Sequence, residues 1–527
     1  MQSRVATFLV CGMLVATVAL AVLSIAWPYG PDHAIMTQVA AAWTWGGAPY
    51  ADMIDVKGPY AFLPYLLALV VPVPPMIALR LLDVMAVCGA AILAYRGLRR
   101  LIDDSTALWG SVLLAALCLR VSYGESAEPD GWFALLTAAV VLARLEDPAN
   151  SGGPVVWMTG IATGIGMLIK PFYLGLAFFP LWTLWRSRQT GSMAACAGRL
   201  FLGAALSTVA ICAVLLSRGA LDEMLSIYAG PMMIEYRKAA QEHPDYWFFL
   251  GWWSIVRRSY IWPLVPLAVA GFVLLRRTHR DLATAFGLWL LAGLAVVTLQ
   301  SRYFLYHLFP AFPPLAFLAA AGAVGAFRRQ LGYPGLLMAT ATIVAFLASV
   351  GSRPQRDLAS AIGAVRARHD PIEAIRSAQP RSGWSAGYLN AARMATHLSR
   401  VAEPTDRAGT WLYEPTALLL AGIRPAGAIF SFNQAYLPRT PFAQSVIRRI
   451  TDDLITGRPR FFLLDCWLVW DQNPGADITR APALSAALGR DYRLVRDEGG
   501  LRLFERAAPG TGNARPCGPH PAAVAVP

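Results

Sequence analysis

The stretch VATFLVCGMLVATVALAVLSIAW, residues Val5 to Trp27, contains no charged side chain and decides the fold class. As a helix rising 1.5 Å per residue, it is long enough to cross the roughly 30 Å hydrocarbon core of a bilayer. Arg4 precedes it, but the apolar run is too long for a signal-peptide core and no clear small-residue cleavage site follows. We therefore expect a retained signal anchor of a membrane protein.

Apolar runs of this kind recur as far as Gly351. Of the 527 residues, 56% are hydrophobic and 15% are charged, and the mean hydropathy is +0.47. Soluble domains contain about 25% charged residues, so the composition indicates a polytopic α-helical membrane protein. We predict about 11 transmembrane helices, and the chain turns polar after them. The predicted spans are Val5–Trp27, Met76–Tyr95, Thr106–Val121, Gly131–Ala143, Val155–Ile169, Phe172–Trp185, Leu200–Leu216, Tyr260–Leu275, Leu282–Leu299, Phe309–Phe327 and Tyr333–Val350.

Arginine is concentrated in alternate loops between these spans. If the N-terminus is cytoplasmic, the inner loops contain Arg96, Arg99, Arg100, Arg144, Arg186, Arg188, Arg199, Arg276, Arg277, Arg280, Arg328 and Arg329. This is the positive-inside pattern, weakest at the loop with Arg144, and it explains much of the net charge of +13 without a nucleic-acid partner. It predicts a multi-pass protein of the bacterial cytoplasmic (inner) membrane with its C-terminal region outside.

The first predicted outer segment, residues 28–75, is too apolar for a free loop. Ala34–Gly47 and Pro59–Val71 are typical of helices that lie in the membrane interface, and Asp32 is placed to cap the first of them. Between them, the stretch PYADMIDVKGPY carries two acids and a lysine. Its acids, three residues apart, share one face if the stretch forms a helical turn, and the equally weighted alternative is a solvated turn.

Lysine is rare in this chain, since only three of its 45 basic side chains are lysines. Lys57, Lys170 and Lys238 all fall on the predicted outer side. Where a chain otherwise uses arginine, a lysine indicates a site that needs a compact ammonium group, such as a point contact to a phosphate oxygen. With three cases, a chance distribution is the alternative.

The order of these features resembles a known family, the GT-C glycosyltransferases that use polyprenyl-phosphate sugars. The branch it resembles contains the lipid A aminoarabinose transferase and the protein O-mannosyltransferases. The similar features are an acid after the first span, G-x-P-Y-x-D, a lysine before an aromatic helix, the acidic loop ESAEPD, the glycine-rich GIATGIGMLIKP and the late RYFLYHLFPAFPPLAFLAA. The family's Glu-Lys-Pro-Pro is here Val56-Lys57-Gly58-Pro59, so a carboxylate that is a metal ligand in some relatives is missing. Asp55 is the candidate substitute, and the use of a divalent metal stays open.

The resemblance implies an inverting transfer that needs a carboxylate near the acceptor oxygen and cations at the donor phosphate. It implies Asp32 as the general base, with Asp130 and Glu128 as the next candidates. The expected phosphate contacts are Lys57, Lys170, Arg258, Arg302, Tyr306 and His307, and the expected substrate-positioning residues are Asp52, Asp55 and His33. The ordinary alternatives are that His307 is an interfacial histidine and that Arg257 and Arg258 anchor the next span. Glu235–Trp253 resembles a mobile loop over such a site.

Two domains and a tail follow from the change in composition. Residues 1–351 form the transmembrane catalytic domain, 352–506 an extracytoplasmic (periplasmic) soluble α/β domain, and 507–527 a Pro, Gly and Ala-rich tail expected to be disordered. The soluble domain shows alternating helix and strand patterns that end in a hairpin at Glu498-Gly499-Gly500. It has no Gly-rich phosphate loop, which favours acceptor recognition over chemistry. The seven cysteines show neither ligand spacing nor a disulfide framework.

The resemblance therefore predicts a cell-envelope enzyme of glycan biosynthesis, which moves a sugar from a polyprenyl-phosphate donor to a lipid or glycan acceptor. The partners expected are this donor, the acceptor and membrane lipids. A glycan polymerase or ligase is the chemically closest alternative. A membrane lipid or glycan transporter predicts ionisable residues at span centres and an internal repeat, and Asp83 is the main acid inside a span. An inactive scaffold for the soluble domain is the remaining alternative.

Overall fold

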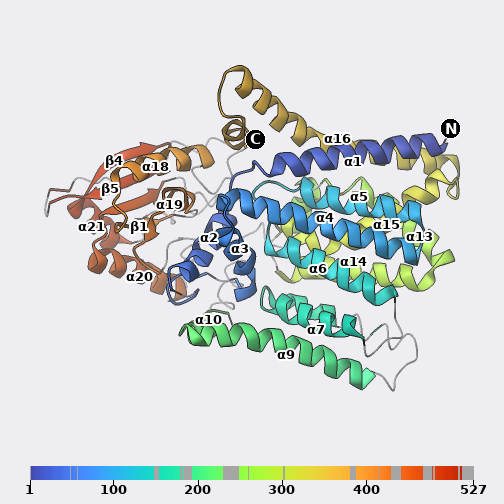
Figure 1. The fold of residues 1–527 in the computed structure, drawn as a ribbon, viewed down its shortest axis with the longest axis horizontal. Helices are drawn as coiled ribbons and strands as arrows, with labels where there is room; N and C mark the ends of the chain where they lie inside the picture. The colour runs from blue at the N-terminus through green and yellow to red at the C-terminus, as the bar shows by residue number, and fades with distance from the viewer. Residues whose placement is uncertain are drawn as a thin grey trace. The chain divides into compact units, whose positions relative to one another are not determined.

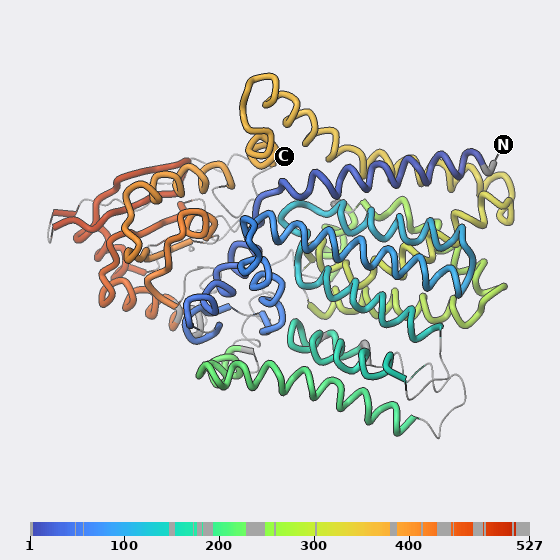
Figure 2. The backbone as a smooth tube through the Cα atoms, viewed as in Figure 1, coloured from blue at the N-terminus to red at the C-terminus, as the bar shows by residue number. Residues whose placement is uncertain are grey.

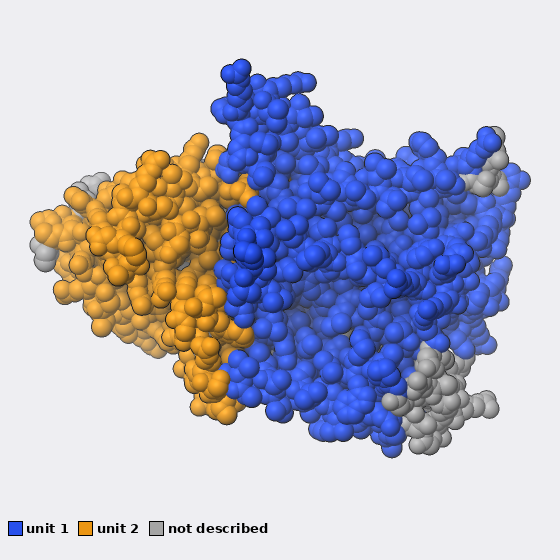
Figure 3. Space-filling model, in the orientation of Figure 1, with its two compact units in different colours: residues 1–27, 57–214, 240–375 blue, residues 28–56, 215–239, 376–527 orange. Residues whose placement is uncertain are grey.

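The structure is a computed structural model with two compact units (Figure 3). Unit 1 comprises residues 1–27, 57–214 and 240–375, and unit 2 comprises 28–56, 215–239 and 376–527. The described residues are 2–47, 49–55, 57–146, 153–177, 182, 193–228, 248–258, 260–300, 303–379, 387–412, 415–428, 441–466, 478, 481–508 and 511–512. Several predicted features lie outside them. These are Arg302, Lys238, residues 235–247 of the predicted loop, most of the second half of the predicted span Phe172–Trp185 and almost all of the predicted tail. The predicted domain boundaries stay predictions.

Unit 1 is a bundle of helices (Figure 1). Six of the described helical segments are long and apolar enough to cross a membrane. These are Arg4–Ser24, Pro75–Leu101, Met193–Ser217, Arg280–Gln300, Leu305–Phe327 and Gly332–Arg366. The helices of the unit are α1 (Gln2–Ser24), η1 (Pro59–Phe62), α3 (Leu63–Val70), α4 (Pro75–Leu101), α5 (Asp104–Arg120), α6 (Pro129–Glu146), α7 (Pro154–Met167), η2 (Pro171–Ala177), α9 (Met193–Ser217), α12 (Phe248–Arg258), α13 (Leu264–Thr278), α14 (Arg280–Gln300), η5 (Leu305–Ala311), α15 (Phe312–Phe327), α16 (Gly332–Arg366) and α17 (Pro371–Ser377).

The helix α15 forms the centre of this bundle, and every one of its residues is buried. It packs against α13 and α5, and small residues let the backbones approach closely. A Cβ atom at Gly271 of α13 would lie 1.9 Å from the Leu318 carbonyl oxygen, and one at Gly322 would lie 2.0 Å from that of Leu267. The apolar pattern of the sequence thus becomes a tightly packed bundle whose outer helices expose apolar side chains, as a multi-pass membrane protein requires.

The two ends of the bundle differ chemically. Where α4, α6 and α15 end and α5 begins, arginines form interhelical or interloop pairs with acids. Arg99 pairs with Asp104 at 2.7 Å and Arg100 with Glu146 at 2.6 Å. Arg328 pairs with Asp103 at 3.2 Å. We call this the arginine end. The opposite end, where α4, α6 and α15 begin, holds Lys57 and Lys170, and we call it the lysine end.

Unit 2 combines residues 28–56 of the first predicted outer segment, and residues 215–239, with the C-terminal domain. Its helices and strands are α2 (Pro31–Thr44), α10 (Leu221–Tyr228), α18 (Tyr388–Val401), β1 (Arg407–Trp411), α19 (Thr416–Ala421), β2 (Arg424–Pro425), α20 (Pro441–Gly457), β3 (Phe461–Asp465), α21 (Pro482–Asp491), β4 (Tyr492–Glu498) and β5 (Leu501–Arg506). The sheet has the order β2-β1-β3-β5-β4, with β1 parallel to β2 and β3 and the last two pairs antiparallel. The C-terminal α/β domain predicted from the sequence is confirmed.

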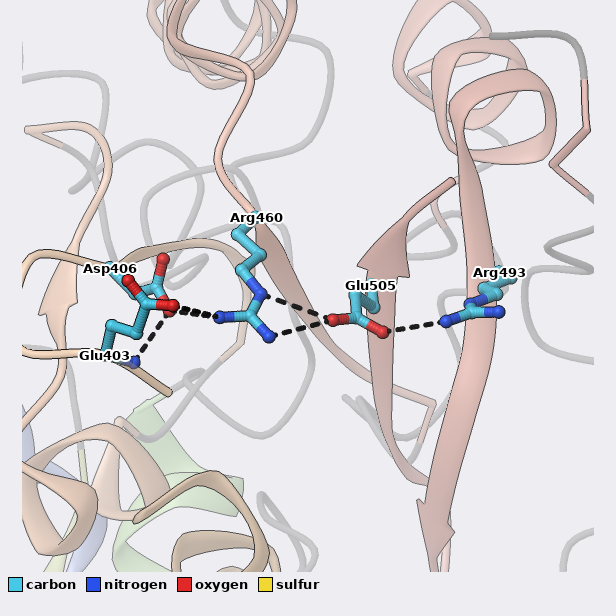
Figure 4. Close-up of polar contacts among 5 residues, drawn as sticks. All are labelled: Glu403, Asp406, Arg460, Arg493 and Glu505. Atoms are coloured by element: carbon cyan, nitrogen blue, oxygen red, sulfur yellow. Dashed lines mark hydrogen bonds and ion pairs between the residues drawn. The ribbon is translucent and has the colours of Figure 1, made fainter. Parts of the chain in front are cut away.

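The sheet is covered by helices on both faces, as the tube in Figure 2 shows. Alternate residues of β3 point to opposite faces. Phe461 and Leu463 join the core formed with α18 and α19, whereas Phe462 lies on the face that α20 covers through Leu454. Along one margin, Arg460 pairs with Asp406 at 2.9 Å and Glu505 at 3.2 Å, in a chain of charges that also includes Glu403 and Arg493 (Figure 4).

Two expectations for unit 2 were wrong. Cys466, directly after β3, is disulfide-bonded, although the cysteine spacing indicated no disulfide framework, because spacing alone does not fix the pairing of distant cysteines. Asp32 is not the cap of α2. The cap residue is Gly30, whose N–H donates to His33 Nδ1 at 2.8 Å, and Asp32 is the second residue of the helix, two positions after the cap.

Candidate functional site

The candidate site at the lysine end is centred on Asp130 in the first turn of α6. Asp130 is only 1% exposed. Its Oδ2 atom lies 2.7 Å from Lys170 Nζ, and its Oδ1 atom accepts a hydrogen bond from the Tyr173 hydroxyl. Lys170 Nζ also donates to Gln300 Oε1 at 3.0 Å. Lys170 and Tyr173 therefore bond to this buried carboxylate, and Gln300 joins the cluster through Lys170.

Local sequence explains why Lys170 and Tyr173 reach this position. Helix α7 ends in a glycine-rich turn, and the Lys170 N–H donates to the Gly166 carbonyl at 2.8 Å. A Cβ atom at Gly166 would lie 2.3 Å from the Phe133 ring and 2.9 Å from Tyr173 Cβ. Only glycine leaves room for these rings, which pack with centroids 4.3 Å apart. The glycine run therefore lets η2 fold back against α6.

Aromatic residues of η5 line the same cluster. The Lys170 ammonium lies 5.3 Å from the centroid of the Tyr306 ring, within cation–π range. The Tyr306 and His307 rings are 4.4 Å apart, and Phe304 stacks on Tyr306 at 5.6 Å. The predicted residues Lys170, Tyr306 and His307 are thus brought together, with His307 buried and Lys170 22% exposed.

The segment that follows Lys57 packs against the segment that precedes Lys170. The Gly58 N–H donates to the Ile169 carbonyl at 3.4 Å. A Cβ atom at Gly58 would lie 1.9 Å from the Leu168 carbonyl oxygen, so no other residue fits without displacing the backbone. Two of the three lysines in the chain therefore lie on segments in direct contact, and Lys57 itself is half-buried.

The loop between α5 and α6 is held by residues that sequence reasoning missed. Arg80 of α4, only 1% exposed, donates to Ser126 Oγ at 2.6 Å and to the Tyr123 carbonyl at 2.7 Å. In the same loop, Glu125 accepts from the Leu305 N–H at 3.2 Å and thereby joins the loop to η5. Burial raises the pKa of Glu125, against the lowering effect of the Ser122 hydroxyl and the Leu305 amide. The predicted acid Glu128 is buried in this loop.

The other predicted site residues belong to unit 2. His33 is fully buried in α2. Asp52 is exposed and Asp55 is fully buried, in a turn closed by the Tyr50 N–H bonded to the Met53 carbonyl. The two acids do not share a helical face, because the chain there forms a turn and not a helix. The Ile54 N–H donates to the Ala428 carbonyl at 3.0 Å, which ties this turn to the C-terminal domain.

No family model and no curated protein matches the chain. Among solved structures, ArnT from Cupriavidus metallidurans in the apo state matches with a TM-score of 0.53 at 14% identity, over 94% of this chain and 97% of that one. The chain has the GT-C fold. The oligosaccharyltransferase AglB from Archaeoglobus fulgidus, in complex with an inhibitory peptide and a dolichol-phosphate, matches with a TM-score of 0.50 at 12% identity, over 95% of this chain and 74% of that one.

Two residues of this site, Gln300 and Tyr173, were not selected from the sequence. Gln300 is an amide at the end of an apolar span, and its Nε2 atom is buried without a hydrogen-bond partner among the described residues. Tyr173 follows Lys170 in the KPFY turn and could have been found from that proximity. Arg302 lies outside the described residues, and Arg258 ends α12 with its side chain undescribed. Among the described residues, no three His, Cys, Asp or Glu side chains are grouped to hold a metal ion.

Proposed function

We propose that this protein is an inverting glycosyltransferase. It moves a sugar from a polyprenyl-phosphate donor to a lipid or glycan acceptor at the outer face of the cytoplasmic membrane. The observation that carries the proposal is the cluster of Lys170, Asp130 and Gln300 at one end of a bundle with the GT-C fold. AglB, of similar fold, has been seen with a dolichol-phosphate, which is a polyprenyl-type lipid phosphate. A cluster of this composition suits a phosphorylated lipid whose headgroup lies at the membrane surface.

The proposed reaction is a single displacement at the anomeric carbon. The acceptor oxygen attacks this carbon, the bond from the carbon to the phosphate oxygen breaks with its electron pair, and a carboxylate takes the acceptor's proton. Because phosphate is a good leaving group, the step needs stabilisation of its negative charge more than a strong acid. One cation about 4 Å away contributes roughly 4 kcal/mol at an effective dielectric constant near 20, before desolvation. We assign this role to Lys57 and Lys170, with Arg258, Arg302, Tyr306 and His307 as further contacts.

The pairing of Lys170 with Asp130 gives each residue a defined task in this proposal. Asp130 holds the ammonium in place, and the 22% of the lysine side chain that stays exposed leaves it accessible to a phosphate. Gln300 accepts from Lys170 through Oε1, so its free Nε2 can donate to a substrate oxygen. Asp32 remains the proposed base, with Glu128 as the alternative and Asp52, Asp55 and His33 as positioning residues.

The orientation of the chain is part of the proposal. The loop arginines support a cytoplasmic arginine end, and we propose that the lysine end and the C-terminal domain face outward. The disulfide at Cys466 supports this, because disulfides persist in oxidising compartments outside the cytoplasm. A reporter fused after Arg506 is expected to be active only outside the cytoplasm, and activity only inside would contradict the orientation.

The test of function is turnover of a labelled polyprenyl-phosphate sugar by the purified protein with crude envelope lipids or glycans as acceptor. We expect release of polyprenyl phosphate and a labelled product in the parent. Asp32→Asn should keep the fold but lose transfer, because an amide of the same shape cannot take the acceptor's proton. The exposed Asp222→Asn on α10 is the matched control and should be fully active. Full activity in Asp32→Asn moves the base to Glu128 or Asp130, whereas no turnover by the parent with any acceptor contradicts the enzyme.

A further inference from the structure

A second group of cations lies at the lysine end, where α5 ends and α16 passes it. Arg120, the last residue of α5, donates through Nε to the Ser349 carbonyl of α16 at 2.6 Å. In return, Arg353 of α16 donates through Nη1 to the Val121 carbonyl directly after α5. Ser349 and Arg353 are one helical turn apart on the same face of α16. The two guanidinium groups therefore cross between the same two segments and lie close to one another.

No carboxylate lies within ion-pair distance of either guanidinium group in the part of the chain that the structure describes, although the buried Glu125 carboxyl is near enough to Arg353 to interact with it electrostatically. The nearest candidate acid on α16, Asp357, is occupied by Arg356 at 3.1 Å and by Trp27 Nε1 at 2.7 Å. Arg120 and Arg353 each use one of their N–H groups in the carbonyl contact, so most of their donors stay available. Both side chains are half-buried.

Two like charges held together at half burial are costly unless an anion compensates them. The carbonyl groups at the end of α5 supply part of this compensation through the helix dipole. Aromatic faces supply another part, since Arg120 lies 5.2 Å from the Tyr260 ring centroid and Arg353 lies 5.9 Å from that of Trp27. These groups are neutral, however, and the nearby Glu125 carboxyl can offset at most one of the two positive charges.

The depth of the pair fits a lipid headgroup. Arg353 lies 21 residues after the start of α16 at the arginine end, which is about 31 Å along a helix and matches the thickness of the hydrocarbon core. Trp27 and Tyr260 are the residue types that gather at headgroup level.

We propose that Arg120 and Arg353 together bind the phosphate group of a membrane lipid at the lysine end of the bundle, at a site formed by α5, α16 and the rings of Trp27 and Tyr260. The bidentate geometry of guanidinium groups suits phosphate oxygens. This site shares none of its residues with the cluster around Asp130. It does not depend on the proposed sugar transfer.

The test is native mass spectrometry of the purified full-length protein from a mild detergent, with lipid probes added. The probes are phosphatidylglycerol, a polyprenyl phosphate, phosphatidylcholine and inorganic phosphate. We expect the parent to retain phosphatidylglycerol and the double variant Arg120→Gln/Arg353→Gln to bind it at least tenfold more weakly. Polyprenyl phosphate, which the cluster around Asp130 is proposed to bind, should be retained equally by both proteins. Arg356→Gln is the matched control, because its guanidinium already pairs with Asp357, and it should retain the lipid like the parent.

A double variant that fails to fold is replaced by Arg120→Lys/Arg353→Lys, which keeps both charges but loses the guanidinium fork. We expect the lysine variant to retain anionic lipid with weakened affinity. Affinity equal to that of the parent in either double variant overturns the proposal. Retention of inorganic phosphate alone, equal retention of phosphatidylcholine, or the same loss in Arg356→Gln also overturns it. Unchanged lipid binding with reduced thermal stability in the glutamine pair shows that the arginines only tie α5 to α16.

Discussion

The two ends of the helical bundle both carry ion pairs between helices, but they use them differently. At the arginine end, Arg100 is 71% exposed and its partner Glu146 is 23% exposed. At the lysine end, Lys170 is 22% exposed and Asp130 only 1%. Exposed pairs contribute little to stability, whereas a buried pair must overcome a large desolvation cost. The exposed pairs at the arginine end therefore add little to stability, and the lysine end holds charges that stability alone does not explain.

The largest expected effect follows from removing one member of the buried pair. In Lys170→Met, Asp130 is left as an uncompensated buried charge, which costs on the order of 3–5 kcal/mol in the free energy of unfolding. Transfer should fall by roughly a thousandfold, because a preorganised cation at the leaving phosphate is lost. Thermal unfolding in detergent and turnover of a labelled donor measure the two effects.

The second variant in this pair of experiments separates stability from chemistry. Lys170→Met combined with Asp130→Asn removes the buried charge and should recover most of the lost stability without recovering transfer. If the double variant regains both, Lys170 acts only as a structural partner of Asp130. The buried pair at the lysine end would then have a structural role only, and the two ends would not differ in function.

The next effect concerns Lys57, whose segment packs on the one that leads to Lys170. We expect Lys57→Ala to lower transfer by roughly a hundredfold, because Lys57 has a proposed contact to the donor phosphate. Lys57→Arg should restore transfer only in part, since a planar guanidinium differs from a compact ammonium in size and geometry. Parent-like turnover in Lys57→Ala would show that this stretch is only a turn between helices.

Sequence periodicity predicted the helices well, because an apolar run must be satisfied by its own backbone hydrogen bonds in a membrane. The predicted span Thr106–Val121 corresponds to α5, and Gly131–Ala143 to the interior of α6. The predicted span Phe309–Phe327 begins inside η5, because Pro310 and Pro313 favour a tight turn before α15. The hairpin at Gly499 and Gly500 was also predictable, since both residues have positive φ angles.

The candidate site was only partly predictable, because its contacts join residues far apart in the chain. Lys170 and Asp130 were both selected from the sequence, but no pattern indicated that they pair across 40 positions. Arg80 was missed because it lies inside an apolar run, where its buried bonds to the loop of Ser126 depend on tertiary packing. For Asp52 and Asp55 the sequence left a shared helical face and a solvated turn as equal alternatives. The structure has a turn, and the sequence did not specify that this turn exposes Asp52 and buries Asp55.

A smaller effect is expected at Glu125, which lies at the lysine end but outside the spans. Burial raises its pKa, so the folded protein holds this proton to a higher pH than the unfolded chain does. The contribution of Glu125 to stability is therefore fully present below the usual carboxyl pKa of about 4.3 and is lost as the pH rises through the raised folded value. Glu125→Gln has no such proton. The unfolding temperature of the parent minus that of Glu125→Gln should fall as the pH rises. A difference that stays constant with pH would contradict a raised pKa of Glu125 in the folded protein.

The smallest effect is expected at the arginine end. Arg100→Gln breaks the 2.6 Å pair with Glu146, yet both groups can be hydrated once separated, because Arg100 is largely exposed and Glu146 partly so. The free energy of unfolding should change by less than about 1 kcal/mol, and the difference should shrink further in high salt, as expected for screened surface charges. Transfer should match that of the parent, since the proposed chemistry lies at the opposite end of the bundle. A loss of stability comparable to that of Lys170→Met, measured by thermal unfolding at low and high salt, would mean that exposure does not distinguish the two ends. A loss of transfer at unchanged stability would instead show that the arginine end takes part in the reaction.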